Sequence, residues 1–243
     1  MDPIIKFENV SYSYSDNKKV LDEISFTIHS KEKIAIIGPN AAGKSTLVSL
    51  FNGIRKAEGK ISINGQIISQ KNSAAIRAMV GVVFQNPEEQ LFCPTVYDDV
   101  AFGPLNMGLT DNEVSEQVRG ALTMVGLTGS EEKYINELSY GEKKLVSLAT
   151  VLSMSPEILV FDEPSANLDP YHRRLIINWM KENDEKTIVV TTHDLDLALE
   201  TCQRVILLAK GRIVDIDLSE KILKNKDFLE AHNLELPLSL QTK

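Results

Sequence analysis

Ile34-Ala-Ile-Ile-Gly-Pro-Asn-Ala-Ala-Gly-Lys-Ser-Thr-Leu47 is the stretch that decides the fold of this chain. It fits the pattern G-x-x-x-x-G-K-[ST], in which successive backbone N–H groups wrap a phosphate and the lysine reaches its outer oxygens. The β-branched run from Lys33 to Ile37 predicts a buried parallel strand, and apolar residues follow the pattern at helical spacing. The start of that helix would direct its partial positive charge at the phosphates.

The residues of this loop each have an expected contact. Lys44 would reach the outer phosphates of a nucleotide, and the hydroxyl of Ser45 would hold Mg²⁺. A chance glycine turn is the alternative, which the strand before the loop and the helix after it disfavour. The nucleotide-binding residues expected here are Gly38, Pro39, Asn40, Ala41, Ala42, Gly43, Lys44, Ser45 and Thr46.

The composition of the 243 residues limits the classes of function. The length allows one large domain or two small ones. A formal net charge of −8 without a basic cluster argues against nucleic acid as a partner. Cys93 and Cys202 lie far apart, which favours buried thiols in a reduced, cytosolic setting. Because no apolar run approaches the roughly 18 residues that span a bilayer, we expect the chain to meet a membrane only through a partner.

Alternating apolar residues predict strands on either side of the loop. Phe7 to Tyr14 and Ile24 to Ile28 read as strands, with a turn at Asp16, Asn17 and Lys18 between them. A hairpin is predicted over Gly59 to Ile68, because Asn-Gly is a typical tight turn between alternating segments. Another apolar strand is expected over Met79 to Phe84.

From Asn86 to Met154 the pattern changes from strands to helices. Prolines interrupt its first half, at Pro87, Pro94 and Pro104. Apolar residues then recur at helical spacing over Asp111 to Val125, with Asp111 as the expected N-cap, and again over Ser139 to Leu152. We therefore expect a helical subdomain inserted between the strands.

Two later apolar strands end in polar residues. Ile158 to Phe161 runs into Asp162 and Glu163, and Thr187 to Thr191 is followed closely by His193. Because ligands of open α/β sheets bind at the carboxyl ends of the strands, we expect these residues to converge on the phosphate-binding loop.

The polar residues at this edge suggest a division of roles. A carboxylate that ends a buried strand is costly unless it is paired or near a metal, so Asp162 is expected beside Mg²⁺. Glu163 is placed to orient or deprotonate the water that attacks a phosphate. His193 would hydrogen-bond the same phosphate, although a single histidine at a strand end is more often structural. Glu163 and His193 are therefore the expected catalytic residues.

The order of these motifs resembles the ATP-binding cassette (ABC) ATPase family over essentially the whole chain. Gln85 falls at that family's glutamine loop, Leu138-Ser-Tyr-Gly-Glu142 at its signature, and Ser165-Ala-Asn-Leu-Asp169 at the loop that crosses a dimer interface. The resemblance implies an α/β fold, with ATP and Mg²⁺ as cofactors and hydrolysis of ATP as the activity. It divides the chain into a P-loop NTPase (RecA-like) core with an antiparallel β subdomain (1–86 and 155–215), a helical subdomain (87–154) and a C-terminal tail (216–243).

The resemblance also implies roles for single residues around the nucleotide. Gln85 would join Ser45 and Asp162 as a Mg²⁺ ligand and would sense the state of the nucleotide together with His193. Tyr14 matches the aromatic residue that stacks on adenine. Packing of Tyr14 against its own strand is the alternative.

The signature residues Ser139 and Gly141 would close over ATP held by another subunit. A head-to-tail dimer with a second ATPase subunit, identical or paralogous, is therefore implied, enclosing two nucleotides. Ser139 has a local explanation that can hold as well, because Ser-x-x-Glu before an apolar run is a helix capping box.

Three residues depart from the family pattern. Ala41 replaces a glycine of the phosphate-binding loop, at a position that the minimal pattern leaves free. Tyr140 replaces a signature glycine and would bring a bulky ring close to the nucleotide of the partner. Asn167 replaces a glycine in the dimer loop, a mild change if that site needs a positive φ.

The branch of the family is indicated by longer segments. Gln85 and Leu138 are 53 positions apart, too few for the long coiled-coil arms of chromosome-maintenance cassettes. The segment from Gln85 to Gly108 resembles energy-coupling-factor importers, in which it contacts the membrane subunit. His193 to Glu200 and the tail from Leu229 to Leu240 are similar to the branch that imports cobalt or nickel.

These resemblances imply the ATPase of a cobalt or nickel importer on the cytoplasmic face of the cell membrane, bound to an integral coupling subunit and a substrate-binding membrane subunit. A vitamin importer of the same type and a soluble cassette ATPase without a transport partner are the alternatives. An exposed groove around Leu91, Phe92 and Phe102 would favour a docking partner, and complete burial would favour the soluble ATPase. His232 and Glu230 alone are insufficient for a metal site.

Overall fold

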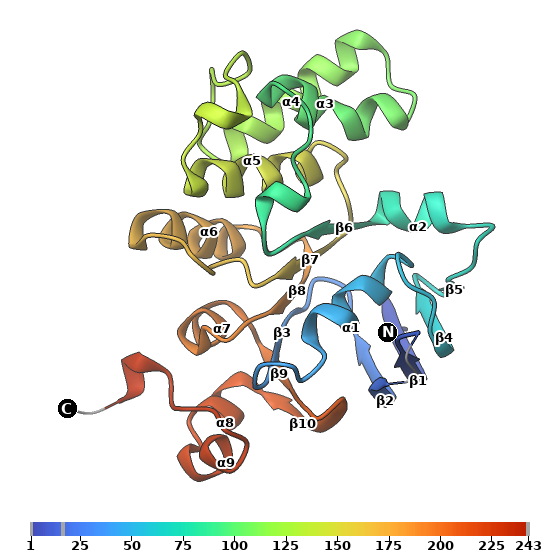
Figure 1. The fold of residues 1–243 in the computed structure, drawn as a ribbon, viewed down its shortest axis with the longest axis vertical. Coiled ribbons are helices and arrows are strands. Elements are labelled where there is room, and N and C mark those ends of the chain that lie inside the picture. The colour runs from blue at the N-terminus through green and yellow to red at the C-terminus, as the bar shows by residue number, and fades with distance from the viewer. Residues whose placement is uncertain (1, 16–17, 242–243) are drawn as a thin grey trace.

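A sheet of mainly parallel strands forms the centre of the computed structural model, which describes residues 2–15 and 18–241 (Figure 1). Its six strands lie in the order β10-β9-β3-β8-β7-β6, with β10 antiparallel to β9 and the others parallel. They are β3 (Lys33–Ile37), β6 (Val80–Val83), β7 (Ile158–Asp162), β8 (Thr187–Thr191), β9 (Arg204–Ala209) and β10 (Arg212–Leu218). The strands predicted from residues 33, 79, 158 and 187 onward are thereby confirmed.

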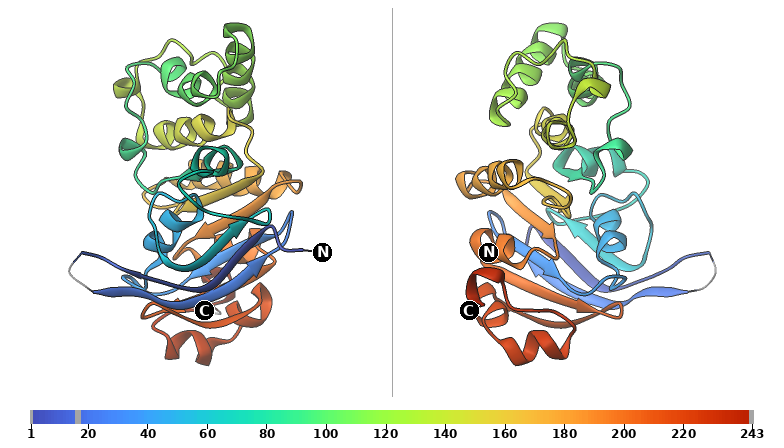
Figure 2. Two further views of the ribbon diagram at one scale, coloured as in Figure 1. Left: turned by 90° about the vertical axis from the view of Figure 1, so that its right-hand side faces the viewer. Right: turned by 60° about the vertical axis from the view of Figure 1, so that its left-hand side comes forward.

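Strands β3, β6, β7 and β8 are buried along their whole length, which explains their continuous apolar runs. In β3, Ala35 and Ile37 join a core formed with helices α6 (Pro170–Glu182) and α7 (Leu195–Thr201). Ile34 and Ile36 join a second core on the opposite face, with α1 (Lys44–Phe51) and a smaller sheet. The sheet is therefore the middle layer of a sandwich (Figure 2).

The smaller sheet is antiparallel, with strand order β2-β1-β4-β5. Its strands are β1 (Ile5–Ser13), β2 (Lys19–Ile28), β4 (Glu58–Ile63) and β5 (Gln66–Ile67). The predicted hairpin is confirmed: Asn64 and Gly65 have φ of 49° and 74°, the positive values that a tight hairpin turn requires. Asp16 and Asn17 of the turn predicted between β1 and β2 lie outside the described residues.

The helical part lies beyond the β6 edge of the large sheet, at the top of Figure 1. It contains η1 (Pro87–Glu89), α3 (Val96–Asn106), α4 (Asp111–Met124), η2 (Ile135–Glu137) and α5 (Tyr140–Leu152). Both predicted helices are present, but Asp111 is not an N-cap. Thr110 caps α4 instead, in a reciprocal capping box with Glu113. Pro104 does not interrupt the chain either, because it lies inside α3, which continues to Asn106.

The remaining helices were not predicted from the sequence. They are α2 (Ser73–Met79), α6, α7, α8 (Ser219–Leu223), α9 (Lys226–Ala231) and the short η3 (Leu238–Leu240). The segment that carries η3 is bound to α7, because the N–H groups of Leu238 and Ser239 donate to the carboxylate of Asp196. Strand β10 continues the large sheet to Leu218, past the expected start of the tail at residue 216. None of the helices in the described ranges is long and apolar enough to cross a membrane.

Candidate functional site

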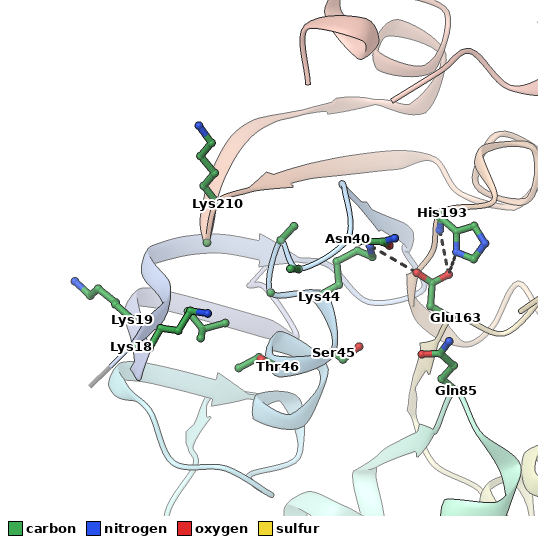
Figure 3. Close-up of a pocket in the computed structure, with 15 residues that line it drawn as sticks. Lys18, Lys19, Asn40, Lys44, Ser45, Thr46, Gln85, Glu163, His193 and Lys210 are labelled. Carbon is green, nitrogen blue, oxygen red and sulfur yellow. Dashed lines mark hydrogen bonds and ion pairs between the residues drawn. The ribbon is translucent and has the colours of Figure 1, made fainter. Parts of the chain in front are cut away.

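An open cavity of about 520 Å³ lies at the carboxyl ends of β3, β7 and β8 (Figure 3). The expected residues that line it are Asn40, Ala41, Ala42, Gly43, Lys44, Ser45, Thr46, Gln85, Glu163 and His193. Three stretches that are far apart in the sequence therefore meet at one edge, as predicted. The expected residues that do not line it are Tyr14, Gly38, Pro39, Ser139, Gly141 and Asp162.

The phosphate-binding loop turns sharply between β3 and α1. A Cβ at Gly38 would lie 2.0 Å from the carbonyl oxygen of Leu208, so only glycine fits there. Gly43 is the N-cap of α1 and has a φ of 106°, which side chains rarely adopt. The loop thus presents its backbone and the start of α1 to the cavity.

Ala41 and Asn167 both occupy positions with φ of 61°. The expectation that residue 167 needs a positive φ is confirmed, and asparagine tolerates it. Position 41 has the same requirement, although the motif leaves it free. A left-handed φ costs an alanine about 1–2 kcal/mol, so Ala41 is a strained residue rather than a neutral replacement.

Lys44 is buried and points back along the loop. Its Nζ donates to the carbonyl oxygen of Gly38 at 2.8 Å and lies 3.7 Å from Oε1 of Glu163. A phosphate that enters the cavity would compete with that carbonyl and that carboxylate for the ammonium group.

Glu163 follows β7 and is buried, with a φ of 45° that turns the chain out of the strand. Its Oε2 accepts hydrogen bonds from the backbone N–H of His193 at 3.0 Å and lies 2.7 Å from the imidazole Nδ1 (Figure 3). The histidine side chain itself is 62% exposed. A buried carboxylate held between a cation and an imidazole is a suitable acceptor for the proton of a water molecule.

The oxygen donors of the site fit Mg²⁺. Ser45 and Gln85 line the same cavity, and Asp162 ends the strand that leads to Glu163. The Asp162 carboxylate is buried and accepts a 2.5 Å hydrogen bond from Thr191, which keeps one of its oxygens fixed. Within residues 2–15 and 18–241, no three His, Cys, Asp or Glu side chains form a metal cage of their own. Mg²⁺ commonly uses one or two protein oxygens together with phosphates and water, so such a cage is not required.

Tyr14 lies beside the cavity wall rather than in it. Its hydroxyl is 3.1 Å from Oγ1 of Thr46, and its ring meets that of Tyr12 edge to face. The guanidinium of Arg55 lies 4.9 Å from the ring centroid. The tyrosines and Arg55 thus form one cluster, which agrees with packing along the strand.

Several residues of the wall were not expected from the motifs. They are Lys18, Lys19, Val20, Lys210 and Gly211. Figure 3 shows the lysines at the end of the cavity opposite Glu163. Lys18 is the last residue of a predicted turn and Lys19 directly follows it, which is the only sequence signal for these two lysines.

Ser139 and Gly141 lie at the start of α5. Ser139 caps this helix: its Oγ accepts from the N–H of Glu142 at 3.3 Å, and the Glu142 carboxylate accepts from the N–H of Ser139 at 2.9 Å. The latter bond, with the Ser139 hydroxyl, holds the pKa of Glu142 below its ordinary value. A Cβ at Gly141 would lie 2.5 Å from the ring of His172 in α6, so a glycine is required for the packing of the two helices. The capping box predicted for Ser139 is confirmed.

Comparisons with known proteins agree with this arrangement. The model of the ABC transporter family matches residues 21–166. The chain is 42% identical over 242 residues to the energy-coupling factor transporter ATP-binding protein EcfA of Carboxydothermus hydrogenoformans, an alignment that covers 98% of this chain and 89% of the relative.

Two solved structures are similar over most of their length. CbiO1 of Clostridium perfringens, described as part of the ABC transporter complex cbiONQ, has a TM-score of 0.84 and 37% identity and covers 98% of this chain and 97% of its own. A dimeric ABC transporter cassette in a post-hydrolysis state with ADP and phosphate has a TM-score of 0.80 and 26% identity, covering 88% and 98%.

Proposed function

Because this chain belongs to the ABC transporter family, we propose that it is the ATPase subunit of an energy-coupling-factor type importer for a transition-metal ion, cobalt or nickel. The chain is an ATP-hydrolysing cassette of that family. The name of the Carboxydothermus relative and the description of the Clostridium complex support the importer type. The cargo rests on the resemblance of residues 193–200 and 229–240 to the cobalt and nickel branch.

The observation that carries the transport function is an exposed apolar surface after the glutamine loop. Phe92 is 66% exposed and Phe102 49% exposed, and their rings meet edge to face at 4.8 Å. Leu91 is buried but lines an adjoining groove of about 380 Å³ together with Phe92 and Pro94. Exposed aromatic pairs beside a groove are typical of surfaces that a partner covers. This feature favours a docked membrane subunit over a soluble ATPase.

A buried carboxylate binds the loop that borders the groove. Oδ1 of Asp99 accepts hydrogen bonds from the backbone N–H groups of Phe92 and Cys93, both at 3.1 Å. Burial raises the pKa of Asp99 above its ordinary value. Asp99 therefore fixes the backbone of the loop that carries Phe92.

The nucleotide site would work by positioning and by proton removal. Lys44 and the loop N–H groups bind the phosphates, and Ser45, Gln85 and Asp162 would hold Mg²⁺, which supplies positive charge to the phosphate oxygens. Glu163 takes the proton of the attacking water, and His193 holds that carboxylate in place. The cavity is open on one side, which leaves room for Ser139 and Gly141 of a second ATPase subunit, identical or paralogous. The similar cassette with ADP and phosphate is itself dimeric.

The partners and location follow from this assignment. The chain would lie on the cytoplasmic face of the membrane, as a peripheral subunit bound to an integral coupling subunit and through it to a substrate-binding subunit. The proposed test is affinity capture of the tagged chain from detergent-solubilised membranes, comparing wild type with Phe92→Ser/Phe102→Ser. Ile67→Ser, which removes an equally exposed apolar side chain far from the groove, is the matched control.

We expect wild type and the control to recover an integral membrane subunit and the double variant to lose it. Recovery that does not depend on the two phenylalanines would overturn the docking surface. For the cargo, we expect the reconstituted complex to take up Co²⁺ or Ni²⁺ when ATP is supplied. Uptake of a vitamin and of neither metal would overturn the metal assignment and identify a vitamin as the cargo.

A further inference from the structure

A lysine of the signature helix is buried among backbone carbonyls beside the nucleotide cavity. Lys144 of α5 is only 1% exposed, and its Nζ donates to the carbonyl oxygens of Phe84 and Gln85, each at 2.7 Å. The carboxylates of Asp162 and Glu163 attract its charge from farther away. An ammonium group is among the side chains least often fully buried, so this placement needs a reason beyond filling the core.

The residue one turn earlier reaches the same carbonyl. The hydroxyl of Tyr140 donates to the carbonyl oxygen of Gln85 at 3.4 Å. Residues four apart lie on one face of a helix, so Tyr140 and Lys144 approach Gln85 together. Tyr140 is the residue that stands in place of a signature glycine, and a glycine could not make this contact.

The rest of the segment after β6 is also bound to α5 through polar contacts. Oε1 of Gln90 accepts from the N–H of Phe84 at 3.0 Å, and its Nε2 donates to Ser147 and Thr150 of α5 at 2.7 and 2.8 Å. The backbone at Gln85 is therefore fixed to the helix from two sides, while the Gln85 side chain lines the nucleotide cavity.

We propose that Lys144 and Tyr140 are positioning residues for Gln85, which join the signature helix to the glutamine loop within one chain. The inference rests on the proposed function in one respect, the role of Gln85 at the Mg²⁺-nucleotide site. A shift of α5 then moves the Gln85 carbonyl, and with it the side-chain amide that faces the cavity. The docking groove begins three residues later, at Glu88, so this contact also lies between the membrane partner and the site.

The test uses variants that remove the donors and leave the shape of the side chains. Lys144→Met and Tyr140→Phe are compared with Lys186→Met, which loses a lysine-to-carbonyl bond elsewhere, and Tyr97→Phe, which loses a tyrosine hydroxyl contact within the helical part. The readouts are kcat for ATP, the Mg²⁺ concentration that gives half-maximal hydrolysis, and the equilibrium affinity for ATP.

We expect Lys144→Met to lower kcat about tenfold and to raise the Mg²⁺ requirement several-fold, while the affinity for ATP stays within about twofold. Tyr140→Phe should change both readouts in the same direction by about twofold, and the two control variants should match wild type. The loss of kcat in the double variant Lys144→Met/Gln85→Ala should not exceed the loss in Gln85→Ala alone, because Lys144 acts through the side-chain amide of Gln85.

Additive losses in the double variant, or an equal loss in Lys186→Met, would overturn the inference. Wild-type kinetics in both positioning variants would do the same while leaving the proposed function intact, whereas an inactive wild-type chain would refute the proposed function itself. If Lys144→Met does not fold, Tyr140→Phe decides the question, because it removes one oxygen from a partly exposed ring.

Discussion

The imidazole Nδ1 of His193 lies 2.7 Å from Oε2 of Glu163, and the backbone N–H of the same histidine donates to that oxygen at 3.0 Å. These contacts join the ends of two neighbouring strands, β7 and β8. The other carboxylate oxygen of Glu163 faces Lys44. The three side chains therefore interact directly. We nevertheless expect their replacement to affect ATP hydrolysis and ATP binding differently.

Glu163→Gln should keep ATP binding and remove hydrolysis. The amide oxygen of glutamine can still accept from the His193 N–H, but it cannot take a proton from water, so we expect at least a ~100-fold loss of kcat. Affinity for ATP should stay within about threefold. Glu157→Gln, at the exposed beginning of the same β7 segment, is the control. A variant that retains a tenth or more of the wild-type rate would exclude Glu163 as the base.

His193→Ala should slow hydrolysis less than Glu163→Gln does. The backbone N–H of residue 193 still donates to Glu163, so the carboxylate loses only one of its two contacts with that residue, and we expect a loss of about 10–100-fold. The double variant should be no slower than Glu163→Gln alone, because the histidine acts on that carboxylate. Steady-state ATPase assays measure both, and multiplicative losses would indicate an independent role for His193.

Lys44→Ala should weaken the binding of the nucleotide itself. The ammonium group is the buried cation of the cavity wall beside the loop N–H groups, and a charge-assisted bond to phosphate contributes enough for at least a ~10-fold change in Kd. Calorimetric titration with ATP in the absence of hydrolysis measures the affinity. An unchanged Kd would contradict the assignment of the phosphate-binding loop.

Arg173→Met should reduce stability in a pH-dependent way. Burial raises the pKa of Asp194, but the bonds from Arg173, at 2.6 and 2.8 Å, and from the N–H of Leu197 outweigh it and leave the pKa below its ordinary value. A carboxyl group with a lowered folded-state pKa stabilises the fold above its unfolded pKa of about 3.9, and this contribution is lost as the pH falls through the folded-state value.

We therefore expect Arg173→Met to lower the free energy of unfolding by about 1–3 kcal/mol at pH 7 and to lose less stability than wild type on acidification. Urea denaturation at a series of pH values measures both effects. Arg174→Met breaks a more exposed pair with Glu200 and should change stability less. Equal losses of unfolding free energy in the two variants would show that the pair of Arg173 and Asp194 stabilises the fold no more than the exposed pair does.

Ala41→Gly should stabilise the chain in the absence of nucleotide. Glycine removes the cost of a left-handed φ at position 41, and its greater freedom in the unfolded chain offsets only part of that gain, which leaves up to about 1 kcal/mol. Ala75→Gly, in the exposed part of helix α2, should instead destabilise by about 1 kcal/mol. Thermal unfolding of both variants measures the sign of each stability change. A loss of stability in Ala41→Gly would contradict the inference that Ala41 is strained.

The central sheet could be predicted because burial on both faces produces uninterrupted apolar runs, as in β3 and β8. The convergence on the cavity followed from the carboxyl ends of those strands. Helix α2 was not predicted, because it has only seven residues and buries one of them, Ile76. Helix α6 was also missed, although its apolar residues lie on one buried face and give a clear helical pattern. Pro104 was misinterpreted as a break. The carbonyl group of Val100, which loses its helical donor to the proline, accepts instead from the hydroxyl of Ser153 at 2.8 Å, a contact that local sequence does not reveal.

The site was predicted where a motif fixes the residue type, as for Lys44 and Glu163, which the structure brings within 3.7 Å. Spacing could not predict Lys210, which enters the wall through a turn between β9 and β10. It could not predict Lys144 either, since a lysine within an apolar helix face gives no sign of the carbonyl groups that it meets. Contacts of this kind depend on where separate elements pack, which local sequence does not encode.

The close packing of Gly141 against His172 has a consequence for how this sequence can change over time. A methyl group at position 141 would already collide with the histidine ring, before a nucleotide or a second chain is present. His172 is in turn anchored to Asp169, the N-cap of α6, by a 2.6 Å contact. A larger residue can therefore replace Gly141 only after a smaller residue has replaced His172. The two positions should consequently co-vary among descendants of a common ancestor.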